Sequence, residues 1–185
     1  YVANAANASM IPSAADYNNA GVLDVTESTG GINTAIAEAI NVVLFTGSAT
    51  SSFNTVTELQ PLVDIATGVM AKIGAWAALA SEAGTGVPTP TDYNNIGFTG
   101  VTADNVGDIN KLILAESDAF SVSTLTKIAA IVDPYFSAMA KISAFANGDG
   151  AADSNSNFEA DSGETGVPTI ADYLAIGVKD GVQPL

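Results

Sequence analysis

The sequence predicts an all-α fold built of tandem three-helix-bundle repeats. Three observations support this prediction: a pattern that occurs three times, helix-capping signals at the start of each copy, and apolar residues at helical spacing after it. β-Branched residues are frequent, but the alternation of period two that marks half-buried strands is missing over any useful length. The capping signals and the helical spacing therefore favour helices.

The repeated pattern is Pro-(Ser/Thr)-x-x-Asp-Tyr-x-x-x-Gly, and its copies begin at Pro12, Pro88 and Pro168. A second match pairs residues 69–77 with residues 138–146, and the sequence Thr-Gly-Val-Pro-Thr occurs twice. Three matches in the same order along the chain indicate a duplicated unit.

The offsets between the matches predict the domain organisation. Residues 11–86 and 87–166 form two complete repeats. Residues 1–10 are the end of a preceding repeat, and residues 167–185 are the start of a further one.

The two complete repeats differ in length at two polar stretches. Aligning Asn33 with Asn110 places about eight extra residues of the first repeat around 45–54. The second repeat carries about eleven extra residues in an acidic insertion at 147–164. Both stretches are rich in Ser, Thr, Gly, Asn or Asp, so we expect loops there.

Each copy of the pattern predicts a short helix with signals at both ends. A hydroxyl residue stands three positions before an Asp, the spacing of a capping box, at Ser13/Asp16, Thr89/Asp92 and Thr169/Asp172. A glycine follows where a left-handed terminating residue is needed, with an apolar residue after it, at Gly21-Val22, Gly97-Phe98 and Gly177-Val178. We therefore interpret each Asp as a helix cap and not as a catalytic group.

The second helix of each repeat is expected to begin near Thr26 and near Thr102. Its apolar stripe contains Ile32, Ile36, Ile40 and Val43 in the first copy, and Val106, Ile109 and Ile113 in the second.

The third helix is the longest, and Thr55-x-x-Glu58 opens it in the first copy. Its stripe contains Leu59, Leu62, Ala66, Val69, Ile73 and Trp76, and in the second copy Ile128, Ile131, Tyr135, Ala138, Ile142 and Phe145. Trp76 and Phe145 occupy equivalent positions. We expect both to be core anchors near the repeat boundary, with an aromatic ligand platform as the alternative.

The composition excludes several classes of function. The 185 residues include 20 acidic residues, five lysines and no Arg, Cys or His, and the net charge is −15. Without Cys or His there is no disulfide framework, thiolate nucleophile, Ser-His-Asp triad or ordinary zinc site. So few cations argue against nucleic acid as a partner. The most apolar stretch, 65–80, is too short and too polar for membrane insertion, and no constellation of residues predicts an enzyme.

The order of motifs resembles a known family. The pattern above followed by Val, a helix with Ile-Asn and a long helix ending in Ala-Lys-Ile-x-Ala is similar to the GA-like three-helix repeats of large bacterial surface proteins. The resemblance covers both complete repeats, whose length of 76 to 80 residues speaks against albumin binding. It implies a tandem array, serving as stalk or spacer, in an exported adhesin at the bacterial cell surface.

The acidic insertion contains the one constellation with the spacing of a metal site. Oxygen-bearing side chains fall at positions 1, 3, 5, 7, 9 and 12 of an EF-hand calcium loop, at Asp153, Asn155, Asn157, Glu159, Asp161 and Glu164. Phe158 stands at position six, where the loop turn needs Gly. Ca²⁺ bound here would stiffen the connection between repeats; the alternative is a solvated acidic linker.

Two kinds of function remain open from the sequence. The first is structural, with neighbouring repeats of the same chain as partners. The second is a binding module whose helix face recognises a host or matrix protein, which an exposed apolar patch would favour. An oligomerising surface-layer unit is a third possibility.

Overall fold

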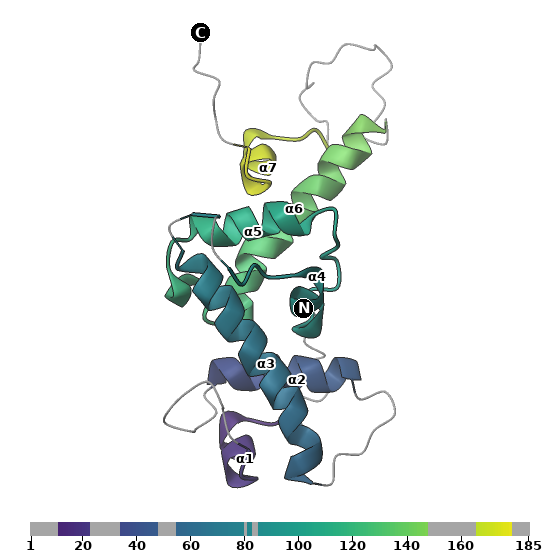
Figure 1. The fold of residues 1–185 in the computed structure, drawn as a ribbon. Helices are drawn as coiled ribbons and strands as arrows, with labels where there is room; N and C mark the ends of the chain where they lie inside the picture. Colours follow the sequence, from purple (N-terminus) through teal and green to yellow (C-terminus); the bar gives the residue numbers. More distant parts are fainter. Residues whose placement is uncertain are drawn as a thin grey trace, which may run out of the picture. The chain divides into compact units, whose positions relative to one another are not determined.

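The computed structural model describes residues 11–22, 34–47, 55–79, 81–82, 85–147 and 166–178 (Figure 1). Every regular element in these ranges is a helix, which confirms the all-α prediction for them. In chain order the elements are α1 (Ala14–Asn19), α2 (Thr34–Gly47), α3 (Val56–Ala77), α4 (Pro90–Asn95), α5 (Val106–Ala115), the 3₁₀-helix η2 (Ala119–Val122), α6 (Leu125–Ala146) and α7 (Ile170–Ala175).

The chain divides into two compact units, Tyr1–Ala129 and Ala130–Leu185, and the division falls within α6. In the first unit α3 contacts α2, α4, α5 and η2, while α2 also contacts α1 and α4. The predicted repeat boundary at residue 86 lies between α3 and α4. The long helix α3 therefore packs against helices on both sides of that boundary.

The central place of α3 follows from its sequence. Its fully or nearly buried residues recur at intervals of three and four positions: Val63, Ala66, Val69, Met70, Ile73 and Trp76. This spacing gives a helix a broad apolar face that needs partners on more than one side. The stripe expected from Leu59 is confirmed from Ala66 onward, whereas Leu59 and Leu62 themselves are half-buried.

The three short helices begin and end as the sequence predicts. In α1, α4 and α7 the Ser or Thr before the helix and the Asp three residues later form a complete capping box. Gly21, Gly97 and Gly177 have φ values of 81°, 96° and 82°. The amide of the following residue donates to a carbonyl five positions back, as from Val22 to Tyr17. This is the Schellman motif, in which glycine adopts the left-handed conformation without a steric penalty.

The second helices correct two expectations. Helix α5 begins at Val106, not near Thr102, because the side chain of Asn105 organises a turn first. Its Oδ1 accepts from the Thr102 amide at 2.8 Å, and its Nδ2 donates to the Gly100 carbonyl at 3.0 Å. Such local bonds from Asn compete with the helix. The expected start near Thr26 lies outside the described residues.

The alignment of the two second helices also differs from the expected one. The hydroxyl of Tyr17 donates to Asn41, 24 residues later, and that of Tyr93 donates to Asn110, 17 residues later. Asn41, not Asn33, is thus the counterpart of Asn110. The extra residues of the first repeat consequently precede Asn41, and their placement around 45–54 was wrong.

The aromatic residues near the ends of the two long helices differ in burial. Trp76 is 3% exposed, as expected of a core anchor, and its Nε1 donates to the Asn110 carbonyl at 2.8 Å. Phe145 is 37% exposed, so the expectation that it is a core anchor was wrong. The physical reason is that burial of an aromatic side chain depends on a partner helix, and for Trp76 that partner is α5, which accepts its hydrogen bond.

Among the described residues, α6 is the one helix long and apolar enough to cross a membrane, by length and composition alone. A packed core helix passes the same test. Of the apolar stretch of α6, 22% is buried; Ile128, Val132 and Tyr135 of this helix are buried, and Lys141 forms an ion pair.

Candidate functional site

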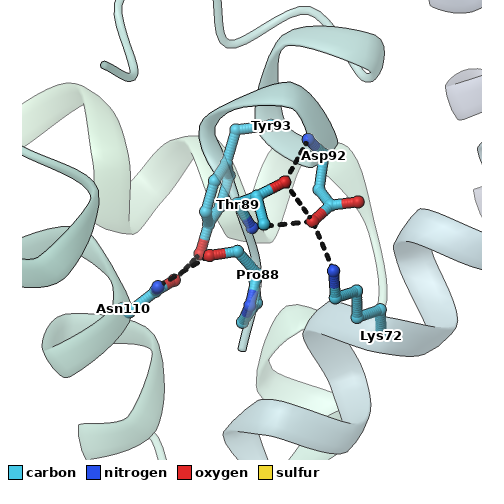
Figure 2. A network of polar contacts seen from close by, with 6 residues as sticks. All are labelled: Lys72, Pro88, Thr89, Asp92, Tyr93 and Asn110. Atoms are coloured by element: carbon cyan, nitrogen blue, oxygen red, sulfur yellow. Dashed lines mark hydrogen bonds and ion pairs between the residues drawn. The ribbon is translucent and has the colours of Figure 1, made fainter. Parts of the chain in front are cut away.

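A polar network joins the end of the first long helix to the start of the predicted second repeat. We call it the junction network; it consists of Lys72, Pro88, Thr89, Asp92, Tyr93 and Asn110 (Figure 2). Helix α3 supplies Lys72, the segment before and within α4 supplies the middle four, and α5 supplies Asn110. Two parts of the network, one around Asp92 and one around Asn110, have different chemistry.

One oxygen of Asp92 receives three hydrogen bonds. Its Oδ2 accepts from the Thr89 amide at 2.7 Å, from Thr89 Oγ1 at 2.7 Å and from Lys72 Nζ at 2.6 Å. The first two bonds belong to the capping box of α4. The third is an ion pair that ties α4 to α3 with both side chains largely withdrawn from solvent. The cap predicted from sequence is therefore also a clamp between two helices.

The second unit contains the same clamp between α6 and α7. Oδ2 of Asp172 accepts from Lys141 Nζ at 2.7 Å and from Thr169 Oγ1 at 2.7 Å. Lys and Asp are 20 residues apart in the first clamp and 31 apart in the second. The difference equals the eleven-residue insertion that the sequence predicts between Lys141 and Asp172. The same pairing is thus formed across connections of quite different length.

In the first copy of the pattern, Asp16 has the cap without the clamp. Its Oδ2 accepts from the Ser13 amide at 2.7 Å and from Ser13 Oγ at 2.6 Å. No lysine in the described part of the chain pairs with Asp16.

The clamps depend on ionised carboxylates. The Lys141 ammonium, together with the amide and hydroxyl of Thr169, lowers the pKa of Asp172 to about 2. For Asp92, burial by itself raises the pKa, but hydrogen bonds from Lys72 and Thr89 outweigh it and the net shift is downward. Hydrogen bonds from Ser13 lower the pKa of Asp16. Donors that favour the charged form explain all three shifts.

Asn110 is the centre of the second part of the network. Its Oδ1 accepts from the Tyr93 hydroxyl at 2.8 Å, and its Nδ2 donates to the Pro88 carbonyl at 2.8 Å. Its backbone carbonyl accepts from Trp76 Nε1 at 2.8 Å. The side chain is buried with these bonds made, as a buried amide requires. A single residue of α5 is thus connected to α3, α4 and the chain before α4.

The first repeat shows the same arrangement around Asn41 of α2. Oδ1 of Asn41 accepts from the Tyr17 hydroxyl at 2.6 Å, and its Nδ2 donates to the Pro12 carbonyl at 2.9 Å. Burial raises the pKa of Tyr17 to about 12 and raises that of Tyr93 as well, with a further contribution from the neighbouring Asp in each case. Both phenols therefore stay protonated and can donate these bonds at neutral pH.

Sequence reasoning missed the partners in both parts of the network. The lysines of Ala-Lys-Ile and the asparagines of Ile-Asn recur in the motif, but the sequence alone assigned them no structural role. Recurrence of a charged or amide residue at the same place in two copies was the signal available. It did not indicate that each Lys meets the Asp of the following copy.

The predicted calcium ligands, from Asp153 to Glu164, lie outside the described residues. Within the part of the chain that the structure describes, no group of three or more acidic side chains is placed to hold a metal ion. The chemistry of the junction network is likewise structural: its donors and acceptors bind one another.

The chain was compared with protein-family models, with curated proteins and with solved structures, and nothing matched.

Proposed function

We propose that this chain is a structural segment, a tandem array of three-helix repeats that serves as stalk or spacer in an exported bacterial adhesin. The observation that carries the proposal is the duplicated Lys–Asp clamp, Lys72 with Asp92 and Lys141 with Asp172. Each clamp joins the long helix of one repeat to the first helix of the next. A connection that recurs between consecutive repeats is what an array held together by nearest neighbours requires.

The direction of the clamp supports a linear array over an isolated domain. The segment 87–166 contributes Asp92 to the preceding long helix and Lys141 to the following short helix. A repeat of this kind presents different surfaces at its two ends, so it stacks head to tail. The expected partners are neighbouring repeats of the same chain.

The acidic composition without cysteine agrees with an extracellular location. The chain carries a net charge of −15 and no Cys. Its fold therefore requires no disulfide bond, and an oxidising compartment finds no thiol to oxidise. The resemblance to GA-like repeats of surface proteins points to the same place. Together with the absence of a catalytic constellation from the sequence, this favours a scaffold over an enzyme.

The location is tested by labelling intact producing cells with an antibody raised against this chain. Labelling without permeabilisation is the expected result, and an anti-cytosolic antibody serves as the control. Labelling that appears after permeabilisation alone would contradict the proposal.

The spacer role is tested separately by small-angle scattering of the purified chain. We compare it with the double variant Lys72→Met, Lys141→Met and with Lys111→Met, whose exposed pair with Asp108 at 3.6 Å connects residues of a single helix. The clamps fix neighbouring repeats, so the double variant should scatter as a more variable ensemble while Lys111→Met matches the parent. Identical scattering from all three proteins would argue against the clamps as spacers.

A further inference from the structure

Three residues near the end of the described chain are exposed although their counterparts are buried. Tyr93 is fully buried, and its counterpart Tyr173 is 41% exposed. Phe98 is 4% exposed against 50% for Val178, and Trp76 is 3% exposed against 37% for Phe145. The difference between the two tyrosines cannot come from the residue type, and all six side chains are apolar in most of their atoms.

Helix α5 contributes to the burial of two residues of the first set, Trp76 and Tyr93. Trp76 and Tyr93 both donate to Asn110 of α5, and α3 packs against α5. The first repeat agrees: Tyr17 is 3% exposed and donates to Asn41 of α2, which packs against α1. In both cases the helix that meets the tyrosine carries an Ile-Asn pair, Ile40-Asn41 or Ile109-Asn110.

The exposed residues lie in α6, in α7 and just after α7, which together make the last module of the described chain. The other features of this module match those of the earlier ones. Helix α7 has its capping box and its Schellman motif, and the pair of Lys141 with Asp172 attaches it to α6. No helix with an Ile-Asn pair occurs among residues 130–147 and 166–178, the described part of the second unit. Among the described residues, what distinguishes this module from the other two is that no Ile-Asn helix packs on it.

We propose that Phe145, Tyr173 and Val178 form the docking surface for the Ile-Asn helix of a further repeat. The Tyr173 hydroxyl donates to the Asn side chain of that helix, and the Asn amide donates to the Pro168 carbonyl, as in the two formed modules. This proposal rests on the tandem-array part of the proposed function. It goes further by naming the residues of the surface and the sequence that occupies it.

The test supplies the missing helix in the same polypeptide. The chain through Val178 is continued with a second copy of residues 99–147, which follow Phe98 in the native sequence, and hydrogen exchange of α7 is compared with that of the original chain. We expect exchange in α7 to slow by about tenfold or more, the effect of one or two buried hydrogen bonds with their apolar contacts. Unchanged exchange in α7 would overturn the proposal.

Two variants make the test specific. Asn110→Ala in the appended copy alone should remove most of the added protection of α7. Tyr173→Phe keeps the ring and removes the hydroxyl, so it should reduce the protection in the extended chain and leave the original chain unchanged. Full protection in both variants would overturn the proposed Tyr–Asn contact.

A second copy of the chain is the competing occupant. If raising the concentration of the original chain slows exchange in α7 and produces dimers by ultracentrifugation, the surface is a self-association site and the proposal is wrong. The experiment uses purified protein, so its outcome is independent of cell-surface labelling. Failure of that labelling would remove the proposed location and leave this docking surface intact.

Discussion

Single acidic residues in this chain combine two tasks that are usually separate. Asp92 and Asp172 cap their own helix through the preceding Thr and bind a lysine from an earlier helix. The two tasks reinforce each other, because the cap holds the carboxylate in the orientation in which it meets the lysine. The lowered pKa values are the measurable sign of this arrangement.

The pKa of Asp172 provides a test of the clamp at low pH. It is about 2 in the folded chain, below the ordinary value of 3.8, so the unfolded state binds protons first as the pH falls. Stability from this group is therefore complete above about pH 4 and is lost as the pH falls toward 2. In Lys141→Met we expect a carboxyl titration by NMR to show a higher pKa for Asp172, with Lys111→Met unchanged. Equal pKa values in both variants would contradict the clamp.

Glycine at the end of a short helix also has a second task in one copy. A Cβ on Gly97 would lie 2.6 Å from Cγ1 of Val42 in α2, whereas a Cβ on Gly21 would have nothing within 4 Å. Both residues have positive φ. Gly97 is therefore required by the conformation and by the close approach of α4 to α2.

These two glycines form a matched pair of variants. Gly21→Ala should cost about 1 kcal/mol through its positive φ alone. Gly97→Ala should cost about 2 to 4 kcal/mol, because the added methyl also displaces Val42. Denaturant unfolding measures both values. Equal destabilisation by the two substitutions would mean that α4 does not lie close to α2.

At the scale of elements, the short helices and the Asn-bearing helices form a recurring pair. The pairs are α1 with α2 and α4 with α5, each joined by a Tyr–Asn hydrogen bond and an Asn–Pro hydrogen bond. Proline has no amide hydrogen, but its carbonyl still needs a donor when it is buried, and the Asn amide supplies one.

Replacing the asparagines should reveal how much each pair depends on burial. Asn110→Ala leaves the Tyr93 hydroxyl and the Pro88 carbonyl without partners in the core and should cost about 2 kcal/mol. Asn41→Ala should cost about 1 kcal/mol, because its bond to Pro12 is exposed and water replaces it. The melting temperatures of the two variants test this order, and a larger loss for Asn41→Ala would contradict it.

Much of the element pattern was predictable from sequence, and the reason is its locality. The capping boxes and terminating glycines connect residues three to five positions apart, so short windows of sequence contain the whole signal. The start of α5 was placed four residues too early because Asn105 offers the backbone a turn that competes with the helix. The exposure of Phe145 was not predictable, because its helical spacing matches that of the buried Trp76.

At the scale of the whole molecule, the proposed array connects repeats through clamps of similar geometry and through connecting segments of different length. The connection at 147–164 is the longer one and carries the calcium-loop spacing described above. We propose that Ca²⁺ at Asp153, Asn155, Asn157, Glu159, Asp161 and Glu164 stiffens this connection. The repulsion among these acids would then be relieved by the cation.

Calcium binding is tested by calorimetry and by melting the chain with and without excess EDTA. We expect a higher melting temperature with Ca²⁺ and loss of this shift in the double variant Asp153→Ala, Glu164→Ala. Phe158→Gly restores the residue that the loop turn needs, so it should tighten binding by about tenfold. No binding heat and no EDTA-dependent shift would show that the segment is a solvated acidic linker.

The sequence by itself determined the helical class, the three copies of the motif, and the caps and terminators of the short helices. These features depend on interactions between residues close in the sequence, so short sequence patterns are enough to predict them. The tertiary structure decided which lysine meets which Asp, that Asn41 is the counterpart of Asn110, and that Trp76 is buried while Phe145 is exposed. Local pattern cannot decide these points: Asn33 and Asn41 both follow Ile, and an aromatic side chain is buried only where another helix is folded against it.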